Sequence, residues 1–163
     1  MAGKRSAPPA DTTMELILWR HAEAEDGTPD ARRPLTPRGR KQAQQVAGWL
    51  NKRLPSATRV LASPALRAVQ TAQALERPIE ELARLGTGAS ASAVLGAAGW
   101  PHAGGTVVVV GHQPTLGRVA SLLLTGDAAD WSVKKGALWW FTCRTRDGLV
   151  ETALRAAIGA ELV

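Results

Sequence analysis

Two histidines and two arginines lie at or just beyond the ends of short apolar runs in this chain: Arg20, His21, Arg67 and His112. A neutral imidazole is a good nucleophile towards phosphorus, and guanidinium groups bind phosphate oxygens through bidentate, charge-assisted hydrogen bonds. Phosphoryl transfer needs little more than positioning and charge stabilisation around its transition state. Nearby arginines disfavour protonation of an imidazole, which keeps it nucleophilic near neutral pH. If the four side chains meet, they can form a site that transfers a phosphoryl group.

Three of the apolar runs are predicted to be neighbouring strands: residues 15–19, 59–62 and 106–110. Four consecutive valines in the third run show no polar alternation, which is typical of a parallel strand buried on both faces. Ligands of open α/β sheets bind at the carboxyl ends of parallel strands. We therefore expect the four side chains to converge at one rim of a sheet. A helix that starts at Ser63-Pro64 would direct its free N–H groups and positive dipole end towards the same anion.

The remaining pattern predicts helices between the strands and a hairpin at the end. Thr36-Pro37 indicates a helix start, and apolar residues at helical spacing continue to about residue 54. Further helices are predicted at 64–75, 91–98 and 115–124, a short strand at 78–82, and a hairpin of 136–143 and 149–156 around Asp147-Gly148. The predicted fold class is therefore α/β: a three-layer α/β/α sandwich, with a mainly parallel sheet and a C-terminal antiparallel hairpin.

The composition indicates one globular domain that favours anionic partners. The 163 residues are 45% hydrophobic and include 20 Lys and Arg against 14 Asp and Glu, which favours phosphorylated proteins, phosphate esters or nucleic acid as partners. The basic residues are scattered, so nucleic-acid binding ranks last. The single cysteine excludes a disulfide framework, and no apolar stretch is long enough for a membrane span. We expect a disordered leader at residues 1–13, a single domain at 14–163, and a reduced, cytoplasmic protein.

Three motifs in this order resemble those of the histidine phosphatase superfamily. They are Arg20-His21, Ser63-Pro64-x-x-Arg67-Ala68-x-Gln70-Thr71 and Gly111-His112-Gln113-Pro114. The short chain and the segment Arg33-Pro34-Leu35-Thr36-Pro37-x-Gly39 are similar in particular to the SixA-type phosphohistidine phosphatases. The similarity extends over about residues 16–125 and implies a phosphoglycerate-mutase-like fold. The first motif of the family is commonly Arg-His-Gly, and here Ala22 replaces the glycine.

The resemblance implies a role for each motif residue. His21 is the nucleophile that is transiently phosphorylated, while Arg20, Arg67 and His112 complete a pocket for phosphate or sulfate. Arg33 matches a further pocket arginine of the SixA branch, with a surface or salt-bridge arginine as the competing interpretation. Larger members of the family supply an acidic proton donor from an inserted segment. This chain offers three candidates for that donor: Glu23, Asp26 and Glu81.

The leading hypothesis is a metal-independent phosphatase, without a cofactor, that dephosphorylates phosphohistidine in proteins during signal transduction. Phosphohistidine has a labile P–N bond and a good leaving group. It therefore depends less on a proton donor than a phosphate ester, for which general acid catalysis is worth about 10²–10⁴-fold. Two alternatives stay open: a small-molecule phosphomonoesterase or mutase of the same superfamily, and a non-catalytic module that binds a phosphorylated ligand.

Other residues with reactive or bulky side chains receive structural interpretations. Ser63 is interpreted as a helix N-cap rather than a nucleophile, His102 as a loop residue without a role, and Cys143 as a buried, inert thiol. Lys134-Lys135 is interpreted either as a solvated turn or as a contact for an acidic protein substrate. Three tryptophans either pack inside or form an interface: Trp131, Trp139 and Trp140.

Overall fold

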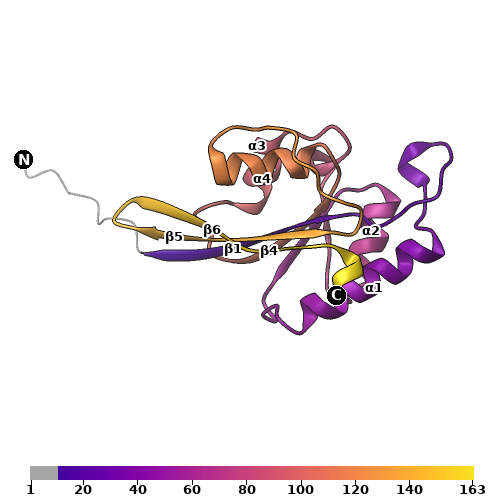
Figure 1. Ribbon diagram of the computed structural model, residues 1–163, viewed down its shortest axis with the longest axis horizontal. Coiled ribbons are helices and arrows are strands. Elements are labelled where there is room, and N and C mark those ends of the chain that lie inside the picture. The colour runs from indigo at the N-terminus through magenta and orange to yellow at the C-terminus, as the bar shows by residue number, and fades with distance from the viewer. Residues whose placement is uncertain (1–10) are drawn as a thin grey trace, which may run out of the picture.

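A mixed β-sheet forms the centre of the molecule in the computed structural model, which describes residues 11–163. Within these residues the sheet has six strands in the order β3-β2-β4-β1-β5-β6 (Figure 1). Four of them are parallel: β1 (Thr12–Arg20), β4 (Gly105–Gly111), β2 (Arg59–Ala62) and β3 (Glu80–Glu81). The other two, β5 (Leu138–Arg146) and β6 (Leu149–Ile158), form an antiparallel hairpin that pairs with β1. The predicted mainly parallel sheet with a C-terminal hairpin is confirmed.

Helices cover both faces of the parallel part and so make the three predicted layers. α1 (Pro37–Asn51) and α2 (Leu66–Gln73) lie on one face, and α3 (Ala91–Ala98) and α4 (Thr115–Thr125) lie on the other (Figure 1). Successive strand residues point to opposite faces, so the valines of β4 divide between two hydrophobic clusters. Val108 belongs to the cluster under α1 and α2, and Val107 to the cluster under α3 and α4. Burial on both faces explains the absence of polar alternation in this strand.

The hairpin turns at Asp147-Gly148, where both residues have a positive φ, 51° and 75°. A two-residue turn of this kind matches the twist of the strands, and glycine adopts it without strain. Beside the hairpin, Trp140 is buried, and Trp131 and Trp139 are partly buried and pack against the core. Trp140 therefore fills the interior, while Trp131 and Trp139 cover the core and stay partly exposed.

Several element boundaries differ from those predicted. β1 begins at Thr12, so the predicted leader of residues 1–13 overlaps this strand, and residues 1–10 of that leader lie outside the described residues. α1 ends at Asn51, and the third strand is limited to Glu80–Glu81. α2 begins at Leu66 because Ala65, with φ −58° and ψ 134°, is still outside the helical conformation and is the N-cap. In the described part of the chain, no helix has the length and apolar character that crossing a membrane requires.

Candidate active site

The carboxyl ends of β1, β4 and β2 bring the motif residues together at one rim of the sheet. Arg20 is the partner of Gly111 in the β1–β4 pair, and the His21 N–H donates a hydrogen bond to the Gly111 carbonyl at 3.1 Å. His112 follows directly, so the His21 and His112 rings lie with centroids 5.2 Å apart. On the other side of β4, the Ser63 N–H donates to the Val110 carbonyl at 3.0 Å. Parallel register therefore produces the convergence that the sequence predicts.

A cavity of about 240 Å³ lies at this rim. We call it the His–Arg pocket and define it by five of its lining residues: Arg20, His21, Arg33, Arg67 and His112. Its lining also includes Ala24, Asp26, Thr87, Gln113 and Lys135. All five residues that the resemblance assigned to nucleophile and phosphate binding thus line a single cavity.

His21 is neutral and has one ring nitrogen free. Its Nδ1 lies 2.8 Å from the carbonyl oxygen of Ala22, which can only accept, so Nδ1 carries the hydrogen. Nε2 therefore retains its lone pair. The pKa of His21 is lowered to about 4, mainly by burial and to a smaller extent by the charges of His112, Arg67 and Arg20, against a raising contribution from the Ala22 hydrogen bond. At neutral pH the ring is therefore uncharged, with a lone pair on Nε2.

His112 is held by a serine that the sequence analysis assigned elsewhere. Its Nε2 lies 2.7 Å from the Ser63 Oγ, and that oxygen accepts a hydrogen bond from the Ala65 N–H at 3.2 Å. When the Ser63 hydroxyl donates to Nε2, the hydrogen of the neutral ring is on Nδ1 and is available to an anion. Because α2 starts only at Leu66, Ser63 does not cap a helix, and the predicted N-cap role is wrong. Burial and then the charge of Arg67 lower the pKa of His112 to about 4. Ser63 fixes the ring plane of His112 beside His21.

Arg67 is 3% exposed and pairs with an aspartate that the sequence analysis did not single out. Its Nη1 donates to the Asp30 carbonyl at 2.9 Å and its Nη2 to Asp30 Oδ2 at 3.1 Å. The second carboxylate oxygen of Asp30 accepts from Arg33 Nε at 3.0 Å. Hydrogen bonds from Arg33 and Arg67 hold the pKa of Asp30 below its usual value, so this carboxylate is charged. The spacing of Asp30 three residues before Arg33 is the one sequence signal for this link.

Two pocket arginines keep donors without acceptors. In the described residues, the buried Nε atoms of Arg20 and Arg67 have no hydrogen-bond partner. Arg20 donates from Nη1 to the Val133 carbonyl at 2.8 Å, which fixes the guanidinium and leaves Nε unsatisfied. Unsatisfied buried donors are costly, and an oxyanion in the pocket would supply the missing acceptors.

The three carboxylates considered as proton donors lie in different places. Asp26 lines the His–Arg pocket. Glu23 lines a neighbouring cavity, and its Oε2 accepts a hydrogen bond from the Thr36 hydroxyl at 2.8 Å. Glu81 lies in β3 and lines neither of these two cavities. The structure therefore leaves Asp26 as the carboxylate that faces the same space as the two imidazoles.

The polar residues of the second motif hold the loop that follows β1. Thr71 Oγ1 accepts from the Ala22 N–H at 3.0 Å, and Gln70 Oε1 accepts from the Leu35 N–H at 2.8 Å. Ala22, in place of the family's usual glycine, is fully buried and packs with Leu35 and Ala43. The methyl group is thus accommodated without opening the site.

Comparison with known proteins gives concordant results from sequence and structure. The family described as histidine phosphatase superfamily (branch 1) matches residues 16–86. Phosphohistidine phosphatase SixA of Escherichia coli is 32% identical over 124 residues, covering 70% of this chain and 76% of that protein. An uncharacterized protein of Mycobacterium tuberculosis is 35% identical over 133 residues, covering 70% of this chain and 75% of that protein.

Solved structures show the same fold. A structure of the protein histidine phosphatase SixA complexed with tungstate aligns with a TM-score of 0.76 at 24% identity, covering 91% of this chain and 99% of that one. A structure assigned to SixA from Nakamurella multipartitia aligns with a TM-score of 0.73 at 27% identity, covering 93% of this chain and 98% of that one. The likeness includes the C-terminal hairpin, since nearly the whole of each chain is covered.

Proposed function

Because the chain belongs to the histidine phosphatase superfamily and is a SixA-type phosphatase, we propose that it removes the phosphoryl group from phosphohistidine in proteins. The reaction proceeds through a phosphorylated His21 and needs no metal. One observation carries the proposal: two neutral imidazoles lie 5.2 Å apart in a pocket lined by three arginines. A module that only binds phosphate would be served by the arginines and has no need of an uncharged imidazole with a free nitrogen.

In the first half-reaction, Nε2 of His21 attacks the phosphorus of the substrate. A bond forms between this nitrogen and phosphorus as the P–N bond of the substrate breaks, and the departing imidazole takes up one proton. Arg20, Arg67 and His112 donate hydrogen bonds to the equatorial oxygens, where charge must be stabilised. In the second half-reaction, water attacks phosphorylated His21 and releases inorganic phosphate, which restores the lone pair of His21 Nε2.

Among the described residues, the pocket lacks a buried, positioned carboxyl group as a proton donor, and this supports phosphohistidine as the substrate. Asp26 is the one candidate donor in the pocket, and it is an exposed loop residue. An imidazole leaves readily with a proton from solvent, whereas an alkoxide needs a positioned acid worth about 10²–10⁴-fold. The arrangement therefore favours cleavage of a P–N bond.

Hydrolysis of a small phosphate ester is the second candidate function, and the position of Asp26 is what favours it. If its carboxyl reaches the leaving oxygen, it can donate the proton that an ester requires. Comparing kcat/KM for phosphohistidine with that for a sugar phosphate distinguishes the two functions. Faster turnover of the ester, lost in Asp26→Asn, would favour the second.

The direct experiment traps the phosphorylated enzyme. After mixing with a phosphohistidine protein and quenching in alkali, wild type should carry acid-labile, alkali-stable phosphate, and chelators should not change its turnover. His21→Ala should lose the trapped phosphate and at least about 10³-fold of the activity, because the nucleophile is gone. His102→Ala, which alters an exposed histidine outside the pocket, is the matched control and should behave as wild type. Full activity in His21→Ala would end the proposal.

A further inference from the structure

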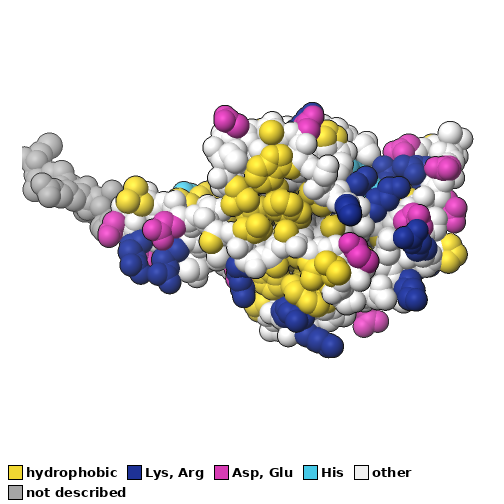
Figure 2. Space-filling view, viewed as in Figure 1, with side chains coloured by type: hydrophobic (Ala, Val, Ile, Leu, Met, Phe, Trp, Pro, Cys, Tyr) yellow, Lys and Arg dark blue, Asp and Glu magenta, His cyan; other side chains and the backbone are white. Residues whose placement is uncertain are grey.

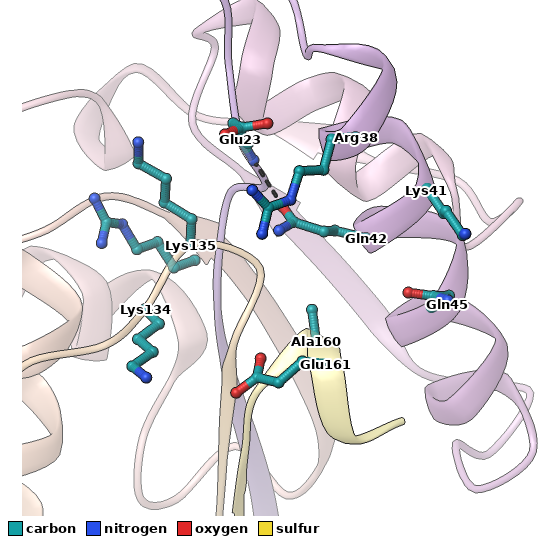
Figure 3. A pocket seen from close by; sticks show the side chains of 10 residues that line it. Glu23, Arg38, Lys41, Gln42, Gln45, Lys134, Lys135, Ala160 and Glu161 are labelled. Atoms are coloured by element: carbon teal, nitrogen blue, oxygen red, sulfur yellow. Dashed lines mark hydrogen bonds between the residues drawn. The ribbon is translucent and has the colours of Figure 1, made fainter.

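A second and larger cavity adjoins the His–Arg pocket. Its volume is about 790 Å³, and Arg20 and Lys135 line both cavities. We call it the basic groove and define it by Arg38, Lys41, Lys134 and Lys135. Figure 3 shows Arg38 and Lys41, which project from α1, on one side and the two lysines of the loop before β5 on the other. When a phosphoryl group occupies the His–Arg pocket, the rest of the substrate molecule can therefore extend into the groove.

The charges of the basic groove are unbalanced. Its lining contains five Lys and Arg side chains against two carboxylates, Glu23 and Glu161. The four cations that define the groove are exposed, and none forms an ion pair with a carboxylate of residues 11–163. In the space-filling view, Lys and Arg side chains lie on the right of the molecule, where α1 and the loop after β1 lie, with Asp and Glu side chains among them (Figure 2). In the lining of the groove itself, cations outnumber carboxylates.

The backbone on both sides of the groove is fixed to the end of β1. In α1, Gly39 approaches the loop after β1 so closely that a Cβ would lie 1.9 Å from the Glu23 carbonyl oxygen. On the other side, the Gly136 N–H donates to the carbonyl oxygens of Arg20 and His21, both at 3.1 Å. Both sides of the groove are therefore attached to the chain next to His21, and Lys134-Lys135 lies directly before this attachment.

The start of α1 carries cations where a helix disfavours them. Helix N-termini have a partial positive charge and are stabilised by Asp and Glu, yet the first turn of α1 has no acidic residue, and the helix begins Pro37-Arg38-Gly39-Arg40-Lys41. The repulsion is small because the side chains are solvated, and the Glu23 carboxylate, which accepts a hydrogen bond from the N-cap Thr36 hydroxyl, offsets part of it. An external anionic partner would offset the rest.

We propose that the basic groove binds an acidic segment of the phosphoprotein substrate, beside the phosphohistidine that occupies the His–Arg pocket. The inference rests on the proposed function and adds a sequence preference to it. A polypeptide that passes between α1 and the loop before β5 would meet cations on both sides. Exposed Lys and Arg side chains attract and orient an extended acidic surface, whereas a small polyanion binds tightly where desolvated donors converge. The exposure of the four cations therefore favours a protein surface.

The test compares two synthetic phosphohistidine peptides of equal length, one flanked by Asp and Glu and one by Ser and Gln, with free phosphohistidine as a third substrate. We expect wild type to prefer the acidic peptide by about tenfold in kcat/KM at low ionic strength, and salt to reduce the preference. The double variant Lys41→Glu with Lys134→Glu should abolish the preference and leave turnover of free phosphohistidine unchanged, since neither residue lines the His–Arg pocket.

The matched control is Lys52→Glu with Arg146→Glu, which makes the same change in net charge at exposed positions outside the groove. This control should keep the preference. Equal kcat/KM for the two peptides in wild type, or a preference that survives in the groove variant, would overturn the assignment and leave the proposed function intact.

If no phosphohistidine substrate is turned over, the proposed function itself has failed, and binding of the unphosphorylated acidic peptide then tests the groove by fluorescence anisotropy. Tighter binding to wild type than to the groove variant supports the assignment, and equal binding contradicts it. Stronger competition by tripolyphosphate than by the acidic peptide would also contradict it, because the groove would then bind a small polyanion.

Discussion

The two adjoining cavities use the same side-chain types in opposite ways. In the His–Arg pocket, Arg67 is buried and donates to Asp30, and Arg20 donates to the Val133 carbonyl. In the basic groove, the cations are exposed and have no carboxylate partner in the described residues. Burial with fixed partners sets the position of a cation within tenths of an ångström, which bond-making requires. Exposed cations set only the local electrostatic potential, which is sufficient to select a binding partner.

The difference extends to the titrating groups. Burial and neighbouring charges lower the pKa of both pocket histidines to about 4. The groove cations are exposed, so salt in the solvent screens their attraction for an anion. The pocket is therefore the part of this surface whose chemistry responds to mild acid, and the groove is the part that responds to salt.

The largest expected effect follows from removing a buried pocket cation. Arg67→Ala should lower kcat/KM for free phosphohistidine by about 10³-fold, roughly 4 kcal/mol, because charge on the transferring phosphoryl group loses a fixed donor. Lys41→Ala, in the groove, should change the same constant by about threefold or less. Steady-state kinetics on the two variants, with circular dichroism to verify folding, measures the contrast. Similar losses in both would show that the two cavities act as one site.

The fold could be predicted from the sequence because short local patterns specify its elements. The valine run of β4, the Thr36-Pro37 start of α1 and the Asp147-Gly148 turn each specify an element through nearest-neighbour physics. The boundary of α2 was not accessible, since Ser63-Pro64 is equally compatible with a helix cap and with an extended segment that ends before the helix.

Only the part of the site that the ends of the strands position could be predicted from the sequence. Residues that follow parallel strands must share a rim, which places His21 near His112. The link between Asp30 and Arg67 spans 37 residues, and that between Ser63 and His112 spans 49. The loop after β1 contains several carboxylates, and spacing alone does not specify which one folds back onto a helix. The Asp30–Arg67 pairing depends on the conformation of that loop, which the motifs do not encode. The Ser63–His112 pairing joins the ends of the neighbouring strands β2 and β4, and it was missed because Ser63 was interpreted as a helix cap.

Mild acid should destabilise the protein through the pocket. Each pocket histidine titrates near 6.5 when unfolded and near 4 when folded, so between these values the unfolded chain binds more protons. This contribution to stability is complete above about pH 6.5 and is lost as the pH falls towards 4. For each ring, the free energy of unfolding should fall by about 2 kcal/mol between pH 7 and pH 5.

Urea unfolding at a series of pH values measures this dependence. His21→Gln should show a shallower decrease between pH 7 and pH 5, since one titrating ring is gone. Lys134→Gln, which removes an exposed groove cation and leaves both pocket histidines in place, should give a curve parallel to that of wild type. Parallel curves for wild type and His21→Gln would mean that the pKa of His21 is close to its ordinary value, and the pocket would lose its distinction from the groove.

The smallest expected effect concerns Asp30, a carboxylate outside the lining of the His–Arg pocket that forms ion pairs with two of the pocket arginines. Asp30 is charged and lies against Arg33 and Arg67, so it weakens the potential that a phosphate ion experiences. Asp30→Asn keeps the shape and a hydrogen-bond acceptor but removes the charge. We expect inorganic phosphate to bind about fivefold more tightly, since one unit charge at this range contributes roughly 1 kcal/mol in a partly solvated site.

Calorimetric titration with inorganic phosphate measures this change, and Asp147→Asn, at the exposed hairpin turn, is a control with the same change in net charge. Asp147→Asn should bind phosphate as wild type does, because the hairpin turn lies outside the His–Arg pocket and salt screens its charge at a distance. Weaker phosphate binding by Asp30→Asn would reverse the interpretation. Asp30 would then act mainly by holding Arg67 in position. The geometry of the buried pocket would depend on this anion, whereas the cations of the groove are positioned without a carboxylate partner in the described residues.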